Sequence, residues 1–79
     1  MKVDVHGFEL DGALLEIYMA LEQCRLDGDE TIEIVHGFHN GEVIKTYLGT
    51  PKFKKQVEAQ GFFLTRVASI KGSTTFRIS

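Results

Sequence analysis

The tetrapeptide VHGF occurs twice in this chain, at residues 5–8 and again at residues 35–38. The first copy completes the alternating stretch 2–6, in which apolar and polar residues take turns. The second copy follows 31–35, TIEIV, which is rich in β-branched residues. Alternation and β-branching both predict strands, so the repeat marks the ends of two strands.

The segment between the two copies has the apolar spacing of a helix from Leu10 to about Asp27, with Gly28 as its stop. A strand, helix and strand within about 30 residues predict a right-handed βαβ unit with parallel neighbouring strands. Both VHGF copies would then lie at the strand ends where open α/β sheets bind ligands, and we expect both histidines to face one crevice. The alternative is that each glycine only turns the chain after a strand.

The second half completes the fold. Residues 41–60 are helical in composition but interrupted by Gly49-Thr50-Pro51, so we expect two helical pieces that meet near Pro51. Residues 62–69 and 74–79 have strand composition, and the turn-forming sequence between them predicts an antiparallel hairpin. The order β-α-β-α-β-β predicts an α/β fold, a two-layer sandwich in which two helices pack on a mixed four-stranded sheet. A chain of 79 residues supports a single domain, 1–79.

The composition indicates a soluble, cytoplasmic protein. Apolar residues make up 43% of the chain, but no run approaches the roughly 18 apolar residues of a membrane span. No basic start precedes an apolar leader, and we expect no membrane association. The single cysteine, Cys24, falls at helical spacing among apolar residues, which predicts a buried thiol rather than a nucleophile.

Charge is distributed unevenly along the chain. Residues 1–42 carry a net charge of −8 and residues 43–79 a net charge of +6. The basic half could present a cationic surface to phosphate or a solvated face, while the acidic half could dock a protein partner. The bases of the second half are Lys45, Lys52, Lys54, Lys55, Arg66, Lys71 and Arg77.

The second VHGF copy continues as HGFHNG at residues 36–41, directly before an expected helix start. Two glycines and an asparagine can adopt positive φ, cap a helix and direct backbone N–H groups at an anion. We interpret this loop as a phosphate seat. The alternative is that its glycines only turn the chain.

These motifs resemble those of a known family. The sequence VDVHG at residues 3–7 is similar to the Leu-Asp-x-His-Gly signature that opens the Smr, or small MutS-related, domain, and His36-Gly37 followed by Gly41 resembles its second His/Thr-Gly-x-Gly loop. The resemblance covers nearly the whole chain. It implies a fold similar to the C-terminal domain of bacterial translation initiation factor three, and nucleic-acid binding. In this chain His39 replaces the second glycine of the loop.

The resemblance marks Asp4 and His6 as catalytic candidates, because several family members nick DNA or cleave RNA. It also marks His36, Gly37 and Gly41 as substrate-loop candidates. The loop composition and the basic half of the chain extend the substrate-binding or phosphate-binding set to His39, Asn40, Lys45, Lys54 and Lys55.

The chemistry of the first motif can be considered separately. Asp4 and His6 are two positions apart on a strand, which places their side chains on one face with Cα atoms roughly 6.5–7 Å apart. A carboxylate that orients an imidazole suits general acid/base cleavage of a phosphodiester, and RNA supplies its own 2′-hydroxyl nucleophile. The alternative is that Asp4 caps a neighbouring backbone group and His6 is a satisfied residue at the strand end.

Metal and stacking sites are less well indicated. The four side chains of Asp4, His6, His36 and His39 include zinc and manganese ligand types, but their spacing is not diagnostic, and we expect no metal and no cofactor. Phe53, Phe62, Phe63 and Phe76 are expected in the core. Phe8 and Phe38, which follow the two His-Gly turns, are the better candidates for stacking on bases.

The sequence therefore predicts an Smr-like nucleic-acid-binding domain with endonuclease capacity, either RNA cleavage or DNA nicking. The alternative is a non-catalytic nucleic-acid-binding or protein-interaction adaptor of the same fold. Asp4 and His6 favour the first function, whereas the changed loop at His39 and Asn40 favours the second.

Overall fold

The structure of this chain is a computed structural model that describes residues 1–37 and 41–79. Phe38, His39 and Asn40, with the predictions made for them, lie outside the described residues. The elements are β1 (Lys2–Asp4), α1 (Leu10–Asp27), β2 (Thr31–Val35), α2 (Glu42–Leu48), α3 (Pro51–Ala59), β3 (Leu64–Ile70) and β4 (Ser73–Ile78).

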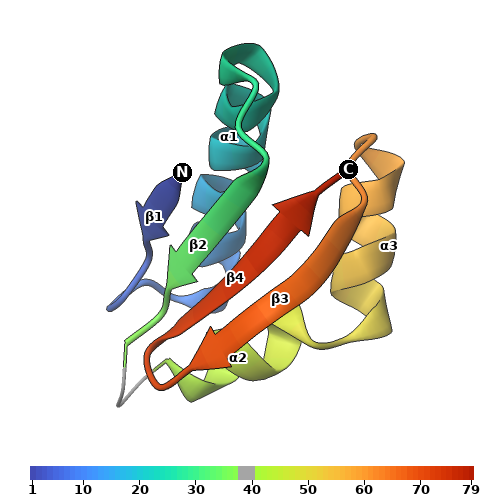
Figure 1. Ribbon diagram of the computed structural model, residues 1–79. Helices are drawn as coiled ribbons and strands as arrows, with labels where there is room; N and C mark the ends of the chain where they lie inside the picture. The colour runs from blue at the N-terminus through green and yellow to red at the C-terminus, as the bar shows by residue number, and fades with distance from the viewer. Residues whose placement is uncertain (38–40) are drawn as a thin grey trace.

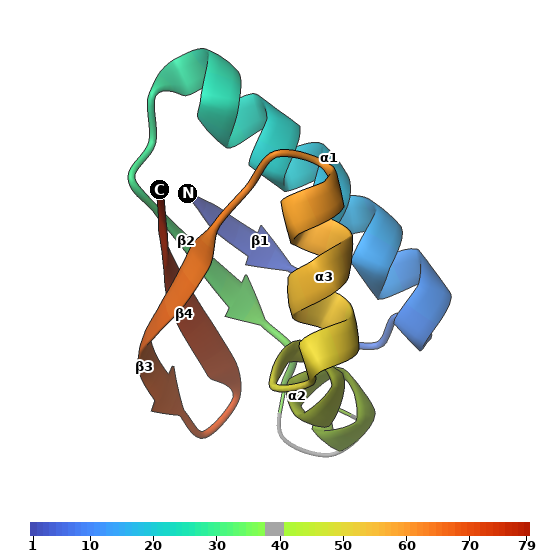
Figure 2. The same ribbon diagram turned by 90° about the vertical axis from the view of Figure 1, so that its right-hand side faces the viewer.

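The four strands form one mixed sheet in the order β1-β2-β4-β3. β1 pairs with β2 in parallel, while β4 pairs antiparallel with both β2 and β3. The predicted parallel neighbours and the predicted hairpin are therefore both confirmed. The helices cover one face of the sheet and leave the other face open (Figures 1 and 2).

The helical region after β2 consists of two helices, and the break falls where the sequence predicted it. The Thr50 hydroxyl accepts a hydrogen bond from the Phe53 N–H at 3.3 Å, and Pro51 follows at the first helical position. Both features favour a new helix start. α1 ends as expected at Gly28, whose φ of 74° is left-handed.

The core lies between the helices and the face of the sheet that they cover. Its buried residues include Val5 directly after β1, Ile32 and Ile34 from β2, and Phe76 from β4. Cys24 is also buried, as expected, and burial raises the pKa of its thiol.

Of the four phenylalanines expected in the core, three are buried and one is not. Phe53, Phe62 and Phe76 are buried, but Phe63 is 55% exposed, so its assignment to the core was wrong. The reason is the extended chain leading into β3, in which successive side chains point to opposite sides. Phe62 takes the inner position, and its neighbour is therefore directed to solvent.

Within the described residues, none of the helices has the length and apolar character needed to cross a bilayer.

Candidate functional site

The two VHGF copies meet at the ends of β1 and β2. Asp4 lies opposite Val35 in the parallel ladder, and the Val5 N–H extends the ladder by donating to the Val35 carbonyl at 2.8 Å. This register places His6 beside Gly37, where an added Cβ would lie 3.1 Å from the His6 Cβ. The copies are thus neighbours in space, but they are offset by one residue.

The glycines of the two copies share one backbone conformation. Gly7 has a φ of 80° and Gly37 a φ of 84°, a left-handed region that other residues adopt only at a cost. After Gly7, the Phe8 N–H closes a turn onto the Val5 carbonyl at 3.1 Å. The repeat therefore encodes the same way of leaving a strand, which is the alternative interpretation given above for these glycines.

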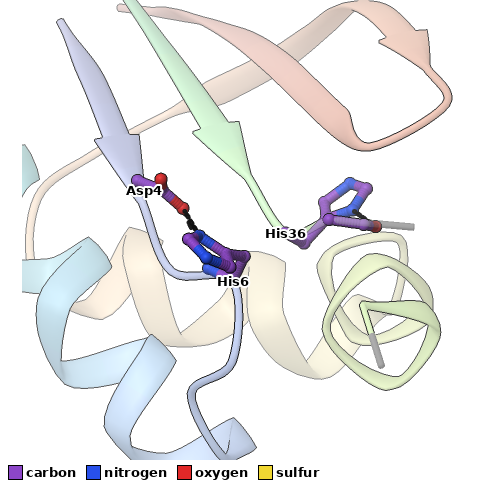
Figure 3. A network of polar contacts seen from close by, with 4 residues as sticks. Asp4, His6 and His36 are labelled. Atoms are coloured by element: carbon purple, nitrogen blue, oxygen red, sulfur yellow. Dashed lines mark hydrogen bonds and ion pairs between the residues drawn. The ribbon is translucent and has the colours of Figure 1, made fainter. Parts of the chain in front are cut away.

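Asp4 and His6 form a hydrogen-bonded pair on the open face of the sheet (Figure 3). The Asp4 Oδ1 lies 2.6 Å from the His6 Nδ1 and also accepts the His6 backbone N–H at 3.0 Å. These hydrogen bonds, the side-chain one first, hold the pKa of the Asp4 carboxyl below its usual value. The side chains of His6 and Asp4 are 69% and 54% exposed, so both are accessible to a large substrate.

The contact with Asp4 determines which nitrogen of the His6 ring carries the proton and which is available to a substrate. An ionised carboxylate can only accept, so the His6 Nδ1 is the donor in this bond. The His6 Nε2 is then the nitrogen left for a substrate, and in the neutral ring it carries the lone pair. A carboxylate behind an imidazole with a free Nε2 is an arrangement suited to proton transfer.

His36 does not join this pair. Its side chain is 1% exposed and directed away from Asp4 and His6 (Figure 3), so the expectation that both histidines face one crevice is wrong. The cause is the two-residue period of a strand. In β2 the buried positions are Ile32 and Ile34, and His36 continues that side into the interior.

The His36 ring is held by hydrogen bonds at both nitrogens. Its Nδ1 lies 3.3 Å from the Gly37 carbonyl oxygen, and its Nε2 lies 3.0 Å from the Thr74 Oγ1. A carbonyl only accepts, so Nδ1 is the donor, and the Nε2 of the neutral ring accepts from the threonine hydroxyl. The backbone N–H groups of His36 and Gly37 both donate to the Gly72 carbonyl, at 2.9 and 3.0 Å. His36 therefore ties the loop entrance to the β3–β4 turn.

Gly41 is required for space rather than for its backbone angles. Its φ of −78° is open to any residue, so the positive φ allowed for at this loop glycine is not used. A Cβ at Gly41 would instead collide with the carbonyl oxygens of His36 and Gly37, and would lie 2.7 Å from the His36 carbonyl carbon. The backbone at the loop exit, Gly41, therefore lies directly against the backbone at the loop entrance, His36 and Gly37.

The structure places Lys54 at the sheet edge opposite the Asp4–His6 pair. Lys54 and Lys55 are exposed on α3, and Lys54 lines a cleft against β3, the sheet edge opposite β1. Lys45 is half-buried on α2. The structure thus does not bring Lys54 to the pair.

Two other lysines line the surface beside the pair. Lys2 and Lys71 border a shallow depression of about 200 Å³ that also reaches Gly37, the neighbour of His6. Neither lysine is among the site residues expected from the sequence. The alternation of β1 would have found Lys2, because it shares a face with Asp4. Lys71 comes from the β3–β4 turn, and only the sheet order brings it here.

In the part of the chain that the structure describes, no three His, Cys, Asp or Glu side chains gather closely enough to hold a metal ion. His39, one of the ligand types considered above, lies outside these residues.

The comparisons with known proteins assign this fold and motif set to a family. The family model of the Smr domain matches residues 3–67, and the chain belongs to the Smr family. The crystal structure of the Smr domain of Thermus thermophilus MutS2 is 27% identical in sequence and matches with a TM-score of 0.68. The match covers 99% of this chain and 96% of that chain, and it confirms the mixed four-stranded sheet with helices on one face. The comparison with curated proteins found no match.

Replacing Gly41 by alanine should destabilise the fold by about 1–3 kcal/mol, because the new methyl group meets two carbonyl oxygens. Gly12→Ala is the matched control. It lies inside α1 with only Phe8 at 3.4 Å, so the same change should stabilise the fold by about 0.5–1 kcal/mol. Urea denaturation measures both. Equal midpoints for the two variants would show that the loop entrance and exit are not in contact.

Thr74→Val should lower the free energy of unfolding by about 1–3 kcal/mol, because it keeps the side-chain shape but leaves the buried His36 Nε2 without a partner. Thr75→Val, on the open face of the same strand, should change it by less than about 0.5 kcal/mol. Both are measured by urea denaturation. A Thr74→Val protein as stable as the control would contradict the hydrogen bond.

Proposed function

We propose that this Smr domain binds nucleic acid and cleaves it, by RNA cleavage or DNA nicking, with Asp4 and His6 as an acid/base pair. The observation that carries the proposal is the 2.6 Å contact between the Asp4 carboxylate and the His6 Nδ1, which leaves Nε2 toward solvent. RNA is the substrate that this pair suits best, because it contains its own nucleophile. The Smr family membership supports the same substrate class.

On RNA, the proposed step begins when the His6 Nε2 accepts the proton of a 2′-hydroxyl. The 2′-oxygen attacks the adjacent phosphorus, the bond from phosphorus to the 5′-oxygen breaks, and the imidazolium returns the proton to that 5′-oxygen. Asp4 does not transfer a proton in this scheme. It orients the ring through Nδ1 and stabilises the imidazolium while the proton is held.

The depression beside the pair is the proposed phosphate contact. Lys2 of β1 and Lys71 of the β3–β4 turn border it together with Glu33, and Gly37 connects it to His6. Ammonium groups at this position would neutralise the phosphates that flank the cleaved bond. Phe8 is 45% exposed directly after the His6-Gly7 turn, which suits stacking on an unpaired base.

A non-catalytic nucleic-acid-binding module is the second candidate. It is favoured by the bond between the His6 backbone N–H and the Asp4 carboxylate, which is a local cap of the strand end. Both side chains are also more than half exposed, so the described residues supply few groups to surround a reacting phosphate. In this function the pair would position the strand end for binding alone.

His6→Ala and Asp4→Asn should each reduce cleavage of a single-stranded RNA by about 10²-fold or more, while the dissociation constant changes little. The double variant should be little worse than either single variant, because the two residues act as one unit. Rates and binding are measured on the same RNA at several values between about pH 5 and 8, where imidazole groups titrate. Asp11→Asn, which removes an exposed carboxylate on α1, is the control.

Cleavage that persists in His6→Ala, with a contaminating nuclease excluded by identical purification, would overturn the catalytic role. Binding without cleavage by the unaltered chain would favour the second candidate.

The salt dependence of binding should identify the contact surface. Replacing Lys2 and Lys71 by glutamine should reduce the slope of log affinity against log salt by about 1.5, since each lost phosphate contact removes roughly 0.7–0.9. The matched pair Lys54→Gln and Lys55→Gln should leave the slope nearly unchanged, because α3 lies toward the other sheet edge. Fluorescence anisotropy at several salt concentrations measures this. The reverse result would place the nucleic acid on α3.

A further inference from the structure

A second concave surface lies at the sheet edge opposite Asp4 and His6. It is a cleft of about 510 Å³ between β3 and the helices α2 and α3. α3 lies on the β3 side of the sheet, as Figure 1 shows, and residues of both elements line the cleft. The cleft has an apolar floor and a basic rim. The floor includes Phe53, Val57, Leu64 and Phe76, and the rim carries Lys54 and Arg66.

β3 offers an unpaired edge along this cleft, since among the described residues it pairs only with β4. The direction of its backbone groups follows from two hydrogen bonds. The Ser79 N–H donates to the Phe63 carbonyl at 2.8 Å, whereas the Ile78 N–H turns away from β3 and donates to the Glu30 carbonyl at 2.7 Å.

The backbone N–H and C=O groups of Phe63 therefore point toward β4. Those of Leu64, which lies opposite Ile78, point away from β4. In an antiparallel ladder the direction alternates, so the N–H and C=O groups of Leu64 and Arg66 point outward from the sheet. The same two residues line the cleft with their side chains. The open edge and the cleft thus form one continuous surface.

The charge of this surface is of one sign. Arg66 and Lys54 are exposed, and neither side chain has an ion-pair or hydrogen-bond partner within residues 1–37 and 41–79. The residues that line the cleft include no carboxylate. The guanidinium of Arg66 lies over Gly49, where its Nη2 would be 2.9 Å from an added Cβ. Gly49 therefore leaves room for the charged group at the cleft rim.

We propose that this edge binds a short, extended, acidic peptide segment as an added strand beside β3. The peptide backbone would pair with Leu64 and Arg66, an apolar side chain would enter the floor, and acidic side chains two positions away would meet Arg66 and Lys54. A nucleic acid lacks the alternating amide groups that the open edge requires. The ladder shift between Arg66 and Ala68 limits regular pairing to a few residues. This interaction is independent of the Asp4–His6 site.

The probe is a fluorescein-labelled heptapeptide, Thr-Glu-Thr-Leu-Thr-Glu-Thr with an amidated end, which places both acids and the leucine on one side of a strand. Binding is followed by anisotropy and by amide chemical shifts of the protein. We expect saturable shifts centred on Leu64 and Arg66. The counterparts with lysine for glutamate, or serine for leucine, should bind roughly tenfold more weakly. No saturable shifts at β3, or equal affinity for the lysine counterpart, would overturn the proposal.

Backbone pairing is tested without changing the protein. Two versions of the peptide carry N-methyl groups, one on the threonines and the other on the glutamates and leucine, so that each blocks one edge of the strand. One version should lose at least roughly tenfold in affinity and the other should retain it, because an added strand pairs along one edge only. Equal affinities for the two versions would overturn strand addition.

The charge contribution is tested by Arg66→Glu, which should weaken binding of the probe roughly tenfold. Arg77→Glu is the control, because Arg77 lies on the open face of the adjacent strand. Thermal unfolding confirms that both variants fold. Equal losses in both variants would show only a general charge effect and contradict the cleft. An RNA oligonucleotide that shifts the same β3 amides and displaces the peptide would identify the cleft as a nucleic-acid surface instead.

Discussion

The parallel pairing of β1 with β2 is the contact on which the candidate site depends. Asp4 lies opposite Val35, so the pairing of the two VHGF copies is shifted by one residue, and Val5 of the first copy falls level with His36 of the second. A strand turns its side chains with a period of two, and a single step therefore sends His6 to the open face and His36 to the core. The same four letters yield one accessible imidazole and one structural imidazole.

The two histidines support each other despite this difference. His36 holds the loop entrance to β4 through Thr74 and to the hairpin turn through its backbone. That entrance includes Gly37, where an added Cβ would lie only 3.1 Å from the His6 Cβ, so the missing side chain leaves room for His6. A residue with a side chain at Gly37 would meet both a left-handed backbone and the neighbouring histidine. The buried His36 thus fixes the position of Gly37, next to which the exposed His6 lies.

Local patterns were sufficient to predict most of the fold. The helical spacing of α1, the break before Pro51 and the alternation around Asp4 each depend on residues close in sequence, where periodicity and capping act. The burial of His36 was also readable, because it continues the alternation of Ile32 and Ile34. A shared crevice was expected because both histidines follow strand ends. The alternation along β2, however, directs His36 to the core.

The remaining site features depend on contacts between distant segments. Lys2 and Lys71 border one depression although they lie at opposite ends of the chain, and only the sheet order brings them together. The space requirement at Gly41 likewise arises from how the loop closes on the His36 carbonyl. Sequence periodicity contains no information about either contact, and His39 and Asn40 lie outside the described residues.

The charge asymmetry of the chain has a different meaning in the fold than in the sequence. β4, from the basic half, pairs with β2 from the acidic half, so the halves are interleaved in one sheet. The basic residues consequently divide between two edges, with Lys71 beside β1 and β2 and with Lys54 and Arg66 beside β3. An open edge strand invites unspecific pairing, and charged side chains and a bulge are the usual protection. β3 has both, and the same features would admit only a short strand of opposite charge.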